Sequence, residues 1–307
     1  GTPNFDDDGN GLVDDSIGYD FFYVDNSPMD ENGHGTHVTG LACGNGYNGV
    51  QGASISAKYM PVQVLDYLGY GTASVLAQGI EYAANNGASI VNMSLGGSDS
   101  KVVRDALVYA NFYCDYLVAA AGNSTLPLPG GCAFPGMTFP AAYGFVMGVE
   151  AERYFSNFDP NGPVETHDVQ NFYNYELAAP GANMFSCLPI NSNGQPRYGR
   201  LTGTSMATPL ISGGLALINS MNPNWSRTTT LIRLVESREY QGKNFCSAFM
   251  PIDFYKALTI VPAPNVKITS VEFKDSSSSA NNDGEIDINE IIAVSYTHLT
   301  LPTKCSV

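Results

Sequence analysis

The chain has 307 residues, of which 44% are hydrophobic and 14% are charged, and its formal net charge is −15. This composition excludes a disordered chain and suits one large domain with a small appendage, while the low content of Lys and Arg argues against a nucleic-acid partner. No apolar run is long enough to span a membrane.

Predicted helices and strands alternate along most of the chain. In chain order, the apolar pattern predicts a helix at 33–43, a strand at 57–65, a helix at 72–86, a strand at 88–95, a helix at 98–111, strands at 116–121, 145–151 and 175–179, and a helix at 204–221. Gly87, directly after the second helix, is a typical stop signal. Buried strands that alternate with helices predict an α/β fold, in which a mostly parallel sheet is covered by helices on both faces.

The pattern changes after residue 258. Residues 261–264 (VPAP) predict a linker, and 266–273 alternate like the first strand of a β module. We therefore expect one domain over 1–260, followed by the linker and the start of a truncated β-sandwich-like module over 261–294. Residues 295–307 (SYTHLTLPTKCSV) break the strand pattern and resemble translated sequencing-adapter read-through, so we exclude them from fold reasoning.

The six cysteines, at positions 43, 114, 132, 187, 246 and 305, form no close-spaced metal-binding or CxxC pattern. One or two disulfides and a set of scattered buried thiols remain equally open. We therefore predict no pairing.

An acidic loop near the start of the chain has the spacing of a calcium-binding loop. Oxygen ligands stand at loop positions 1, 3, 5, 7 and 9: the side chains of Asp6, Asp8, Asn10 and Asp14, and at position 7 the carbonyl of Leu12. Gly11 occupies position 6, but Ile17 stands at position 12, where such loops carry a bidentate glutamate. We predict that this loop binds Ca²⁺ instead of being a solvated acidic loop, because crowded carboxylates favour a cation.

A second acidic cluster lies near the other end of the chain. Its members fit positions 3, 5, 7, 9 and 12 of a calcium loop around Gly284: Asn281, Asp283, Glu285, Asp287 and Glu290. Position 1, however, is Ser279. For this cluster, calcium binding and a solvated surface remain equally open.

Three short segments carry residues with catalytic chemistry: 32–40 (NGHGTHVTG), 119–123 (AAAGN) and 203–209 (GTSMATP). His34 stands between two glycines and is suited to act as a general base near neutral pH. Asn123 follows a predicted strand, where its amide can stabilise an oxyanion. Ser205 starts a predicted helix, whose N-terminus favours developing negative charge. Taken singly, each residue is more often structural: a hydrogen-bonded histidine, a turn residue and a helix cap.

Together, the three segments resemble the histidine, oxyanion-asparagine and serine motifs of the subtilase family, in the family's order. The resemblance extends from about residue 6 to 258 and includes three further segments: 91–97 (VNMSLGG), similar to the family's substrate-binding strand, 155–158 (FSNF) and 178–181 (AAPG). It implies a three-layer, subtilisin-like catalytic domain over 1–260. It also implies that His34 is the base, Ser205 the nucleophile, Asn123 the oxyanion donor and His37 a structural neighbour.

The family's third triad member, an aspartate at the end of a buried apolar strand, has no match in this sequence. None of the aspartates before His34 follows an apolar run or stands before Thr-Gly or Ser-Gly, and the closest, Asp20, lies in a segment that resembles the family's next strand. We expect the missing strand, which is interior to the family's sheet, to lie upstream of residue 1. We therefore expect the 307 residues alone to fold poorly and to show little or no protease activity, because neighbouring strands lose their ladder partners.

The resemblance also places a specificity pocket. Its walls are expected to be Ser94, Leu95, Gly96 and Gly97 on one side and Ala120, Ala121 and Gly122 on the other. Thr138, in a segment (TFPA) that resembles the family's pocket base, is small and uncharged. We predict a preference for apolar or medium-sized residues before the scissile bond.

The resemblance implies a secreted or cell-surface, calcium-stabilised serine endopeptidase that cleaves protein or peptide substrates through a Ser-His-Asp triad and an acyl-enzyme. It also implies a propeptide in the intact precursor, and we expect a monomer. One alternative is a catalytically inactive, subtilase-like binding module, although intact His34, Asn123 and Ser205 count against it. The other is a structural, calcium-dependent surface protein, which only the acidic loops support.

Overall fold

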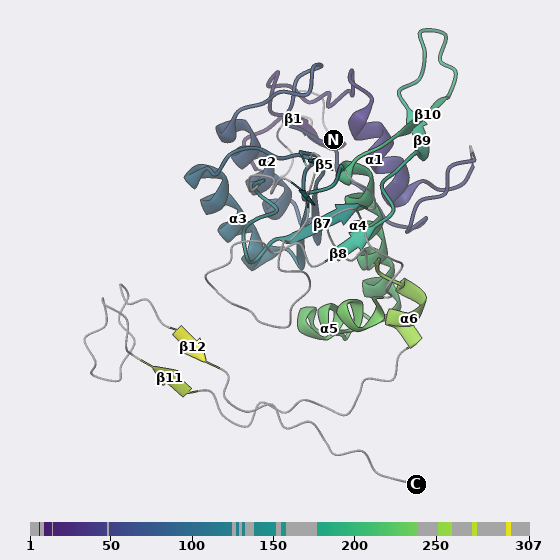
Figure 1. The fold of residues 1–307 in the computed structure, drawn as a ribbon. Coiled ribbons are helices and arrows are strands. Elements are labelled where there is room, and N and C mark those ends of the chain that lie inside the picture. Colours follow the sequence, from purple (N-terminus) through teal and green to yellow (C-terminus); the bar gives the residue numbers. More distant parts are fainter. Residues whose placement is uncertain are drawn as a thin grey trace. The chain divides into compact units, whose positions relative to one another are not determined.

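The computed structural model describes the greater part of the chain (Figure 1). The described residues are 6, 9–13, 15–47, 49–124, 127–128, 131–132, 138–151, 155–157, 177–238, 251–259, 272–274 and 293–295. The chain divides into two compact units, Gly1–Thr259 and Ile260–Val307. Each unit is described separately below.

The first unit contains six helices and ten strands among its described residues. In chain order they are β1 (Tyr19–Asp20), α1 (His34–Cys43), β2 (Val62–Gln63), α2 (Ala73–Asn85), β3 (Ile90–Met93), α3 (Lys101–Tyr113), β4 (Tyr116–Ala120), β5 (Pro127–Leu128), β6 (Gly131–Cys132), β7 (Met147–Ala151), β8 (Leu177–Ala179), β9 (Met184–Leu188), β10 (Arg197–Leu201), α4 (Thr204–Met221), α5 (Arg227–Ser237) and α6 (Phe254–Thr259). The helix predicted at 204–221 has these bounds in the structure, whereas the strand predicted at 57–65 shortens to β2.

A parallel sheet with the strand order β3-β4-β7-β8 forms the centre of the first unit. Side chains of β4 alternate between two hydrophobic clusters, as the period of two in a strand requires. Leu117 and Ala119 pack in the cluster of α2 and α3, and Tyr116 and Val118 pack in the cluster of α4. Because both faces of β4 are buried, all five of its residues are apolar and buried.

Helices cover both faces of this sheet. Figure 1 shows α2 and α3 on one side of the strands and α4 with α1 on the other. Val38 and Leu41 of α1 pack against Met206 of α4 in a separate small cluster. The predicted α/β fold, with a mostly parallel sheet between two helical layers, is therefore confirmed.

The parallel strands fall into two separate sheets, because among the described strands β1 and β2 pair with each other and with no other strand. Helix α2 packs against both sheets: a Cβ added at Gly79 would lie 3.0 Å from Val62 of β2, and Ile80 shares a cluster with Met93 of β3. Among the described residues, no strand pairs with the edge of β3 that faces away from β4.

This unpaired edge explains one difference from the sequence prediction. The strand predicted at 88–95 was expected to be buried, yet three of the four residues of β3 are only partly buried. Its neighbour β4 is fully buried, because β4 pairs on both edges and β3 on one. An apolar strand with an open edge leaves backbone N–H and C=O groups without ladder partners.

An antiparallel hairpin of β9 and β10 leads into α4. The apolar pattern did not predict it, because its strands mix apolar, aromatic and charged residues. Phe185 stacks on Tyr198 with their ring centroids 5.7 Å apart, and the Arg200 guanidinium lies 5.3 Å from the centre of the Phe185 ring. The hairpin also contacts α1, because the Ser186 hydroxyl donates to the carbonyl of His37 at 2.7 Å.

In the second unit, β11 (Glu272–Lys274) pairs antiparallel with β12 (Ala293–Ser295). The second acidic cluster, at 281–290, lies outside the described residues. So does the segment 296–307, which makes up most of the stretch that we interpret as read-through sequence.

Three cysteine side chains are described, and all three are free thiols: Cys43, Cys114 and Cys187. Burial raises the pKa of each thiol, so each is protonated at neutral pH. The side chains of Cys132, Cys246 and Cys305 lie outside the described part of the chain. Across the described residues, the helices are too short or too polar to cross a membrane.

Candidate active site

His34 is the first residue of α1, and an acidic side chain four residues earlier holds this helix end. The Asp30 carboxylate accepts hydrogen bonds from the backbone N–H of Gly33 at 2.7 Å, and from the N–H and hydroxyl of Thr36 at 2.7 and 2.6 Å. It also accepts the Asn32 N–H at 3.0 Å. A carboxylate that satisfies free N–H groups at a helix N-terminus fixes the first turn, so Asp30 sets the position of His34.

The environment of His34 favours its neutral form. Burial lowers the pKa of the imidazole, the Asp30 carboxylate opposes this, and His37 adds to the lowering. A neutral imidazole can accept a proton at neutral pH. His37 itself is fully buried, and its Nε2 lies 3.0 Å from the Met184 carbonyl and 3.3 Å from that of Gly199, so His37 anchors α1 to the hairpin.

Ser205 lies in the first turn of α4, where the free N–H groups of a helix favour negative charge nearby. Its carbonyl has no helical donor, because Pro209, four residues on, has no N–H. The Ser94 hydroxyl donates to that carbonyl at 3.0 Å. In return, Ser205 Oγ donates to the Ser94 carbonyl at 3.2 Å. Within the described residues, no hydrogen bond joins the His34 ring to Ser205 Oγ.

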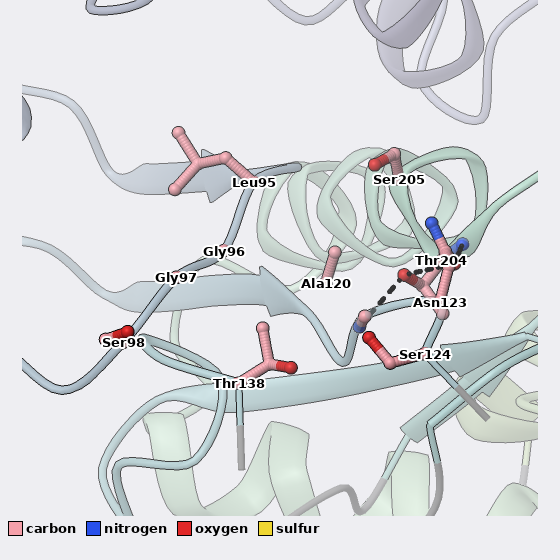
Figure 2. A pocket seen from close by; sticks show the side chains of 11 residues that line it. Leu95, Gly96, Gly97, Ser98, Ala120, Asn123, Ser124, Thr138, Thr204 and Ser205 are labelled. Carbon is pink, nitrogen blue, oxygen red and sulfur yellow. Dashed lines mark hydrogen bonds between the residues drawn. The ribbon is translucent and has the colours of Figure 1, made fainter. Parts of the chain in front are cut away.

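Asn123 stands just beyond the end of β4, and its amide is oriented by Thr204. Its Oδ1 accepts hydrogen bonds from the backbone N–H of Thr204 at 2.9 Å and from the Thr204 hydroxyl at 3.1 Å. The Gly122 N–H donates to the same hydroxyl at 3.1 Å. Since Oδ1 faces these donors, Nδ2 is the end of the amide that remains for another acceptor. Figure 2 shows Asn123, Thr204 and Ser205 together at one end of a pocket.

The pocket has a volume of about 480 Å³. It is lined by Leu95, Gly96, Gly97, Ser98, Ala120, Gly122, Asn123, Ser124, Thr138, Thr204 and Ser205 (Figure 2). The structure thus brings together most of the residues expected from the sequence, although Ser94 and Ala121 do not line the pocket. Ser98, Ser124 and Thr204 were not predicted, although each stands next to a predicted residue in the sequence.

Small side chains and backbone form the pocket walls. Gly97 and Phe139 exchange two backbone hydrogen bonds of 2.8 and 3.0 Å, and the Phe139–Pro140 peptide bond is cis. A Cβ added at Gly96 would lie 2.3 Å from Thr138 Cγ2, so a larger residue at that position would require Thr138 to move. No charged side chain is among the described residues that line the pocket.

The acidic loop at 6–14 is described in part. Asp6 accepts backbone N–H bonds from Gly9, Asn10 and Gly11, and Asn10 Oδ1 accepts the Leu12 N–H at 2.8 Å. Asp8 and Asp14 lie outside the described residues. Among the described residues, no group of three or more His, Cys, Asp or Glu side chains is placed to hold a metal ion.

A family model described as the subtilase family matches residues 2–248. The chain belongs to the subtilase family. This subtilase is 38% identical to the thermostable alkaline protease of Halalkalibacterium halodurans over 227 residues, which cover 73% of this chain and 57% of that protein. It is 34% identical to thermitase of Thermoactinomyces vulgaris over 248 residues, covering 77% of this chain and 81% of that protein.

The solved structures give the same fold. The structure of sphericase superposes on this subtilase with a TM-score of 0.62 and 28% sequence identity, covering 76% of this chain and 82% of that chain. The segment shared with the alkaline protease spans little more than half of that relative.

Proposed function

We propose that this chain is the main part of a serine endopeptidase that cleaves peptide bonds through an acyl-enzyme. One observation carries the proposal. Three segments that are far apart in the sequence line a single pocket, and they contribute Leu95–Ser98, Asn123 and Ser205. A nucleophile, an amide donor and an uncharged side-chain pocket are the parts that acyl transfer needs.

The roles follow from the chemistry of each residue. The neutral His34 takes the proton of Ser205 Oγ while the oxygen attacks the substrate carbonyl. The resulting oxyanion accepts hydrogen bonds from Asn123 Nδ2 and the backbone N–H of Ser205. His34 then returns its proton to the leaving amine, and water releases the acyl group by the same steps. Ser205 Oγ must turn from the Ser94 carbonyl toward His34 for the first step.

The aspartate of the proposed Ser-His-Asp triad is not assigned to any described residue. We place it at the end of a further parallel strand between β2 and β3. The open edge of β3 and the packing of α2 against both β2 and β3 support this position. The 307 residues alone should digest casein poorly, and robust digestion that a serine-protease inhibitor stops would overturn this part of the proposal.

The nucleophile is tested by labelling. With the aspartate-bearing strand present, a serine-directed fluorophosphonate should label Ser205, as mapped by mass spectrometry, and the Ser205→Ala and His34→Ala variants should not be labelled. A folded protein that remains unlabelled would instead support the inactive, subtilase-like binding module.

The pocket supports a preference for apolar or medium-sized residues before the scissile bond. Thr138, the expected base, lines the pocket together with Gly96 and Gly97, and none of the three is charged. Cleavage of a peptide library should therefore favour such residues, and a strict requirement for Arg or Lys would contradict the proposal.

Ca²⁺ is proposed as a structural ligand of the loop at 6–14, with Asp6, Asp8, Asn10, Asp14 and the Leu12 carbonyl as its ligands. The turn in which the Asp6 carboxylate accepts three backbone N–H groups supports this, because it keeps the loop that carries the proposed ligands short and closed. Added Ca²⁺ should raise the melting temperature of the wild type and have little effect on an Asp6→Asn variant. An equal rise in both would contradict the assignment.

The family likeness also supports three broader proposals. The intact protein is secreted or located at the cell surface, is made with a propeptide and acts as a monomer on protein or peptide substrates. Each is checked on the protein from its native source, by N-terminal sequencing of the mature form and by its mass in solution.

A further inference from the structure

The oxyanion donor stands on a turn that needs support from outside its own segment. Gly122, directly before Asn123, has a φ of +99°, in the region that only glycine adopts readily. Asn123 lies three residues after Ala120, the last residue of β4, so the ladder bonds of the sheet do not hold it directly. A side chain from elsewhere has to fix this turn if Asn123 Nδ2 is to keep one direction.

Asn157 forms hydrogen bonds to the turn on both sides of Asn123. Its side chain is fully buried, its Nδ2 donates to the Ala121 carbonyl at 2.9 Å, and its Oδ1 accepts the Ser124 N–H at 2.8 Å. Its backbone N–H donates to the Gly122 carbonyl at 2.8 Å. One residue therefore bonds the backbone at two positions before the oxyanion donor and at one position after it.

The same amide reaches the base of the pocket. Asn157 Nδ2 also donates to Thr138 Oγ1 at 3.0 Å. A Cβ added at Gly122 would lie 2.6 Å from Asn157 Nδ2 and 2.7 Å from Thr138 Oγ1, so these two side chains fill the space beneath the turn. The turn, Asn157 and the pocket base form one packed unit.

We propose that Asn157 is a positioning residue for the oxyanion donor Asn123. Thr204 orients the amide of Asn123 from one side, whereas Asn157 fixes the backbone that carries it. Asn157 does not line the pocket, so it acts through Asn123 and does not touch the substrate. This inference rests on the proposed function.

The test compares kinetics of the active protein with the aspartate-bearing strand present. Because a small displacement of a catalytic group can cost up to about 100-fold in rate, Asn157→Ala should lower kcat by roughly 10- to 100-fold and leave KM within about twofold. Asn157→Asp keeps the shape and the acceptor for the Ser124 N–H but loses the amide donor. It guards against failure of the alanine variant to fold, and its kcat should also fall.

Asn219→Ala is the matched control. The Asn219 amide also forms two side-chain hydrogen bonds near β4, but at the opposite end of the strand. It accepts from the Tyr116 hydroxyl at 3.3 Å and donates to the Asp115 carboxylate at 3.4 Å. This variant should be destabilised with kcat unchanged. If Asn157→Ala behaves in the same way, or raises KM without lowering kcat, the proposal is wrong.

A double-variant cycle asks whether Asn157 acts through Asn123. Once Asn123→Ala has removed the oxyanion donor, adding Asn157→Ala should lower kcat by no more than about twofold, because coupled residues are not additive. Independent, multiplying losses would overturn the proposal.

One measurement separates this inference from the proposed function. If the wild type is not labelled at Ser205, the proposed function fails, and hydrogen exchange still decides the role of Asn157 in the turn. The Ser124 amide should lose its protection in Asn157→Ala and keep it in Asn219→Ala. An unchanged Ser124 amide would show that Asn157 does not hold the turn.

Discussion

The two sides of the candidate site are held in different ways. On the pocket side, Asn123 is held by hydrogen bonds from Thr204 at the start of α4, and the buried Asn157 bonds both Thr138 and the backbone of Ser124. On the base side, Asp30 fixes the start of α1, yet no hydrogen bond among the described residues joins His34 to Ser205. The proposed oxyanion half of the site is therefore held by described residues, whereas among the described residues no side chain forms a hydrogen bond to the His34 imidazole.

The largest expected effect comes from supplying a partner for the His34 imidazole. A synthetic apolar peptide that ends in Asp-Thr-Gly, refolded with the chain, should occupy the open edge of β3 and accelerate fluorophosphonate labelling of Ser205. A peptide with Asn in place of the Asp should fill the edge equally well but leave labelling slower by on the order of 10⁴-fold, because the imidazole then lacks its anionic partner. Equal labelling rates with the two peptides would show that the aspartate does not activate His34.

The stability of the two parts of the sheet should differ as well. Leu117 of β4 is fully buried between paired strands, so Leu117→Ala should lower the free energy of unfolding by about 2–5 kcal/mol. Val91 of β3 is only partly buried, so Val91→Ala should cost about 1 kcal/mol. Chemical denaturation of both variants measures the difference. The cost at Val91 should rise when the strand peptide is bound, and a constant cost would show that the peptide does not cover β3.

The stability that Asp30 gives to the start of α1 depends on pH. Burial raises the pKa of Asp30, but its hydrogen bonds from Thr36, Gly33 and Asn32 outweigh this and hold the pKa below its usual value. The resulting stability is present above the unfolded pKa and is lost as the pH falls through the lower, folded value. Asp30→Asn should therefore cost about 1–2 kcal/mol at neutral pH, and the difference from the wild type should shrink below about pH 4 in acid titrations of unfolding. A difference that grows toward acid pH would contradict this.

The smallest expected effect concerns Tyr143, which lies five residues after the pocket residue Thr138. The Tyr143 hydroxyl donates to Asp99 at 2.7 Å, and burial, together with that hydrogen bond, raises its pKa to about 12. A raised pKa stabilises the fold below the unfolded value near pH 10, and this contribution is lost as the pH rises toward 12. Tyr143→Phe should cost about 0.5–1 kcal/mol at neutral pH and less above pH 11, as measured by thermal melts. A cost that does not change with pH would show that the hydroxyl is not responsible.

The sequence predicted the parts of this molecule that depend on local pattern. A short apolar run located β4, a stretch of small residues located α4, and the motifs around Asn123 and Ser205 located one end of the pocket. Contacts made across the fold could not be predicted in this way. The hydrogen bonds of Asn157 to Ala121 and Ser124 join residues that are more than thirty positions apart in the sequence, and no periodicity predicts them.

Other features were missed for different reasons. The β9–β10 hairpin carries no uniform apolar face, because Phe185 and Tyr198 stack on each other instead of entering the core. The cap of α1 by Asp30 was missed because the side chain acts from four residues before His34 and not from the usual position next to the helix. The open edge of β3, by contrast, agrees with the loss of ladder partners expected from the family resemblance, although hydrophobicity alone does not reveal which strand is affected.

The hairpin has a consequence for motion. His37 and Ser186 tie β9 to α1, and β10 ends at Leu201, only four residues before Ser205. Figure 1 shows the hairpin beside α1. Helix α1, which begins with His34, and helix α4, which carries Ser205, are therefore joined by the hairpin as well as by their own packing. We expect a thermal displacement of α1 to carry the entry to α4 with it, so that His34 and Ser205 move together instead of apart.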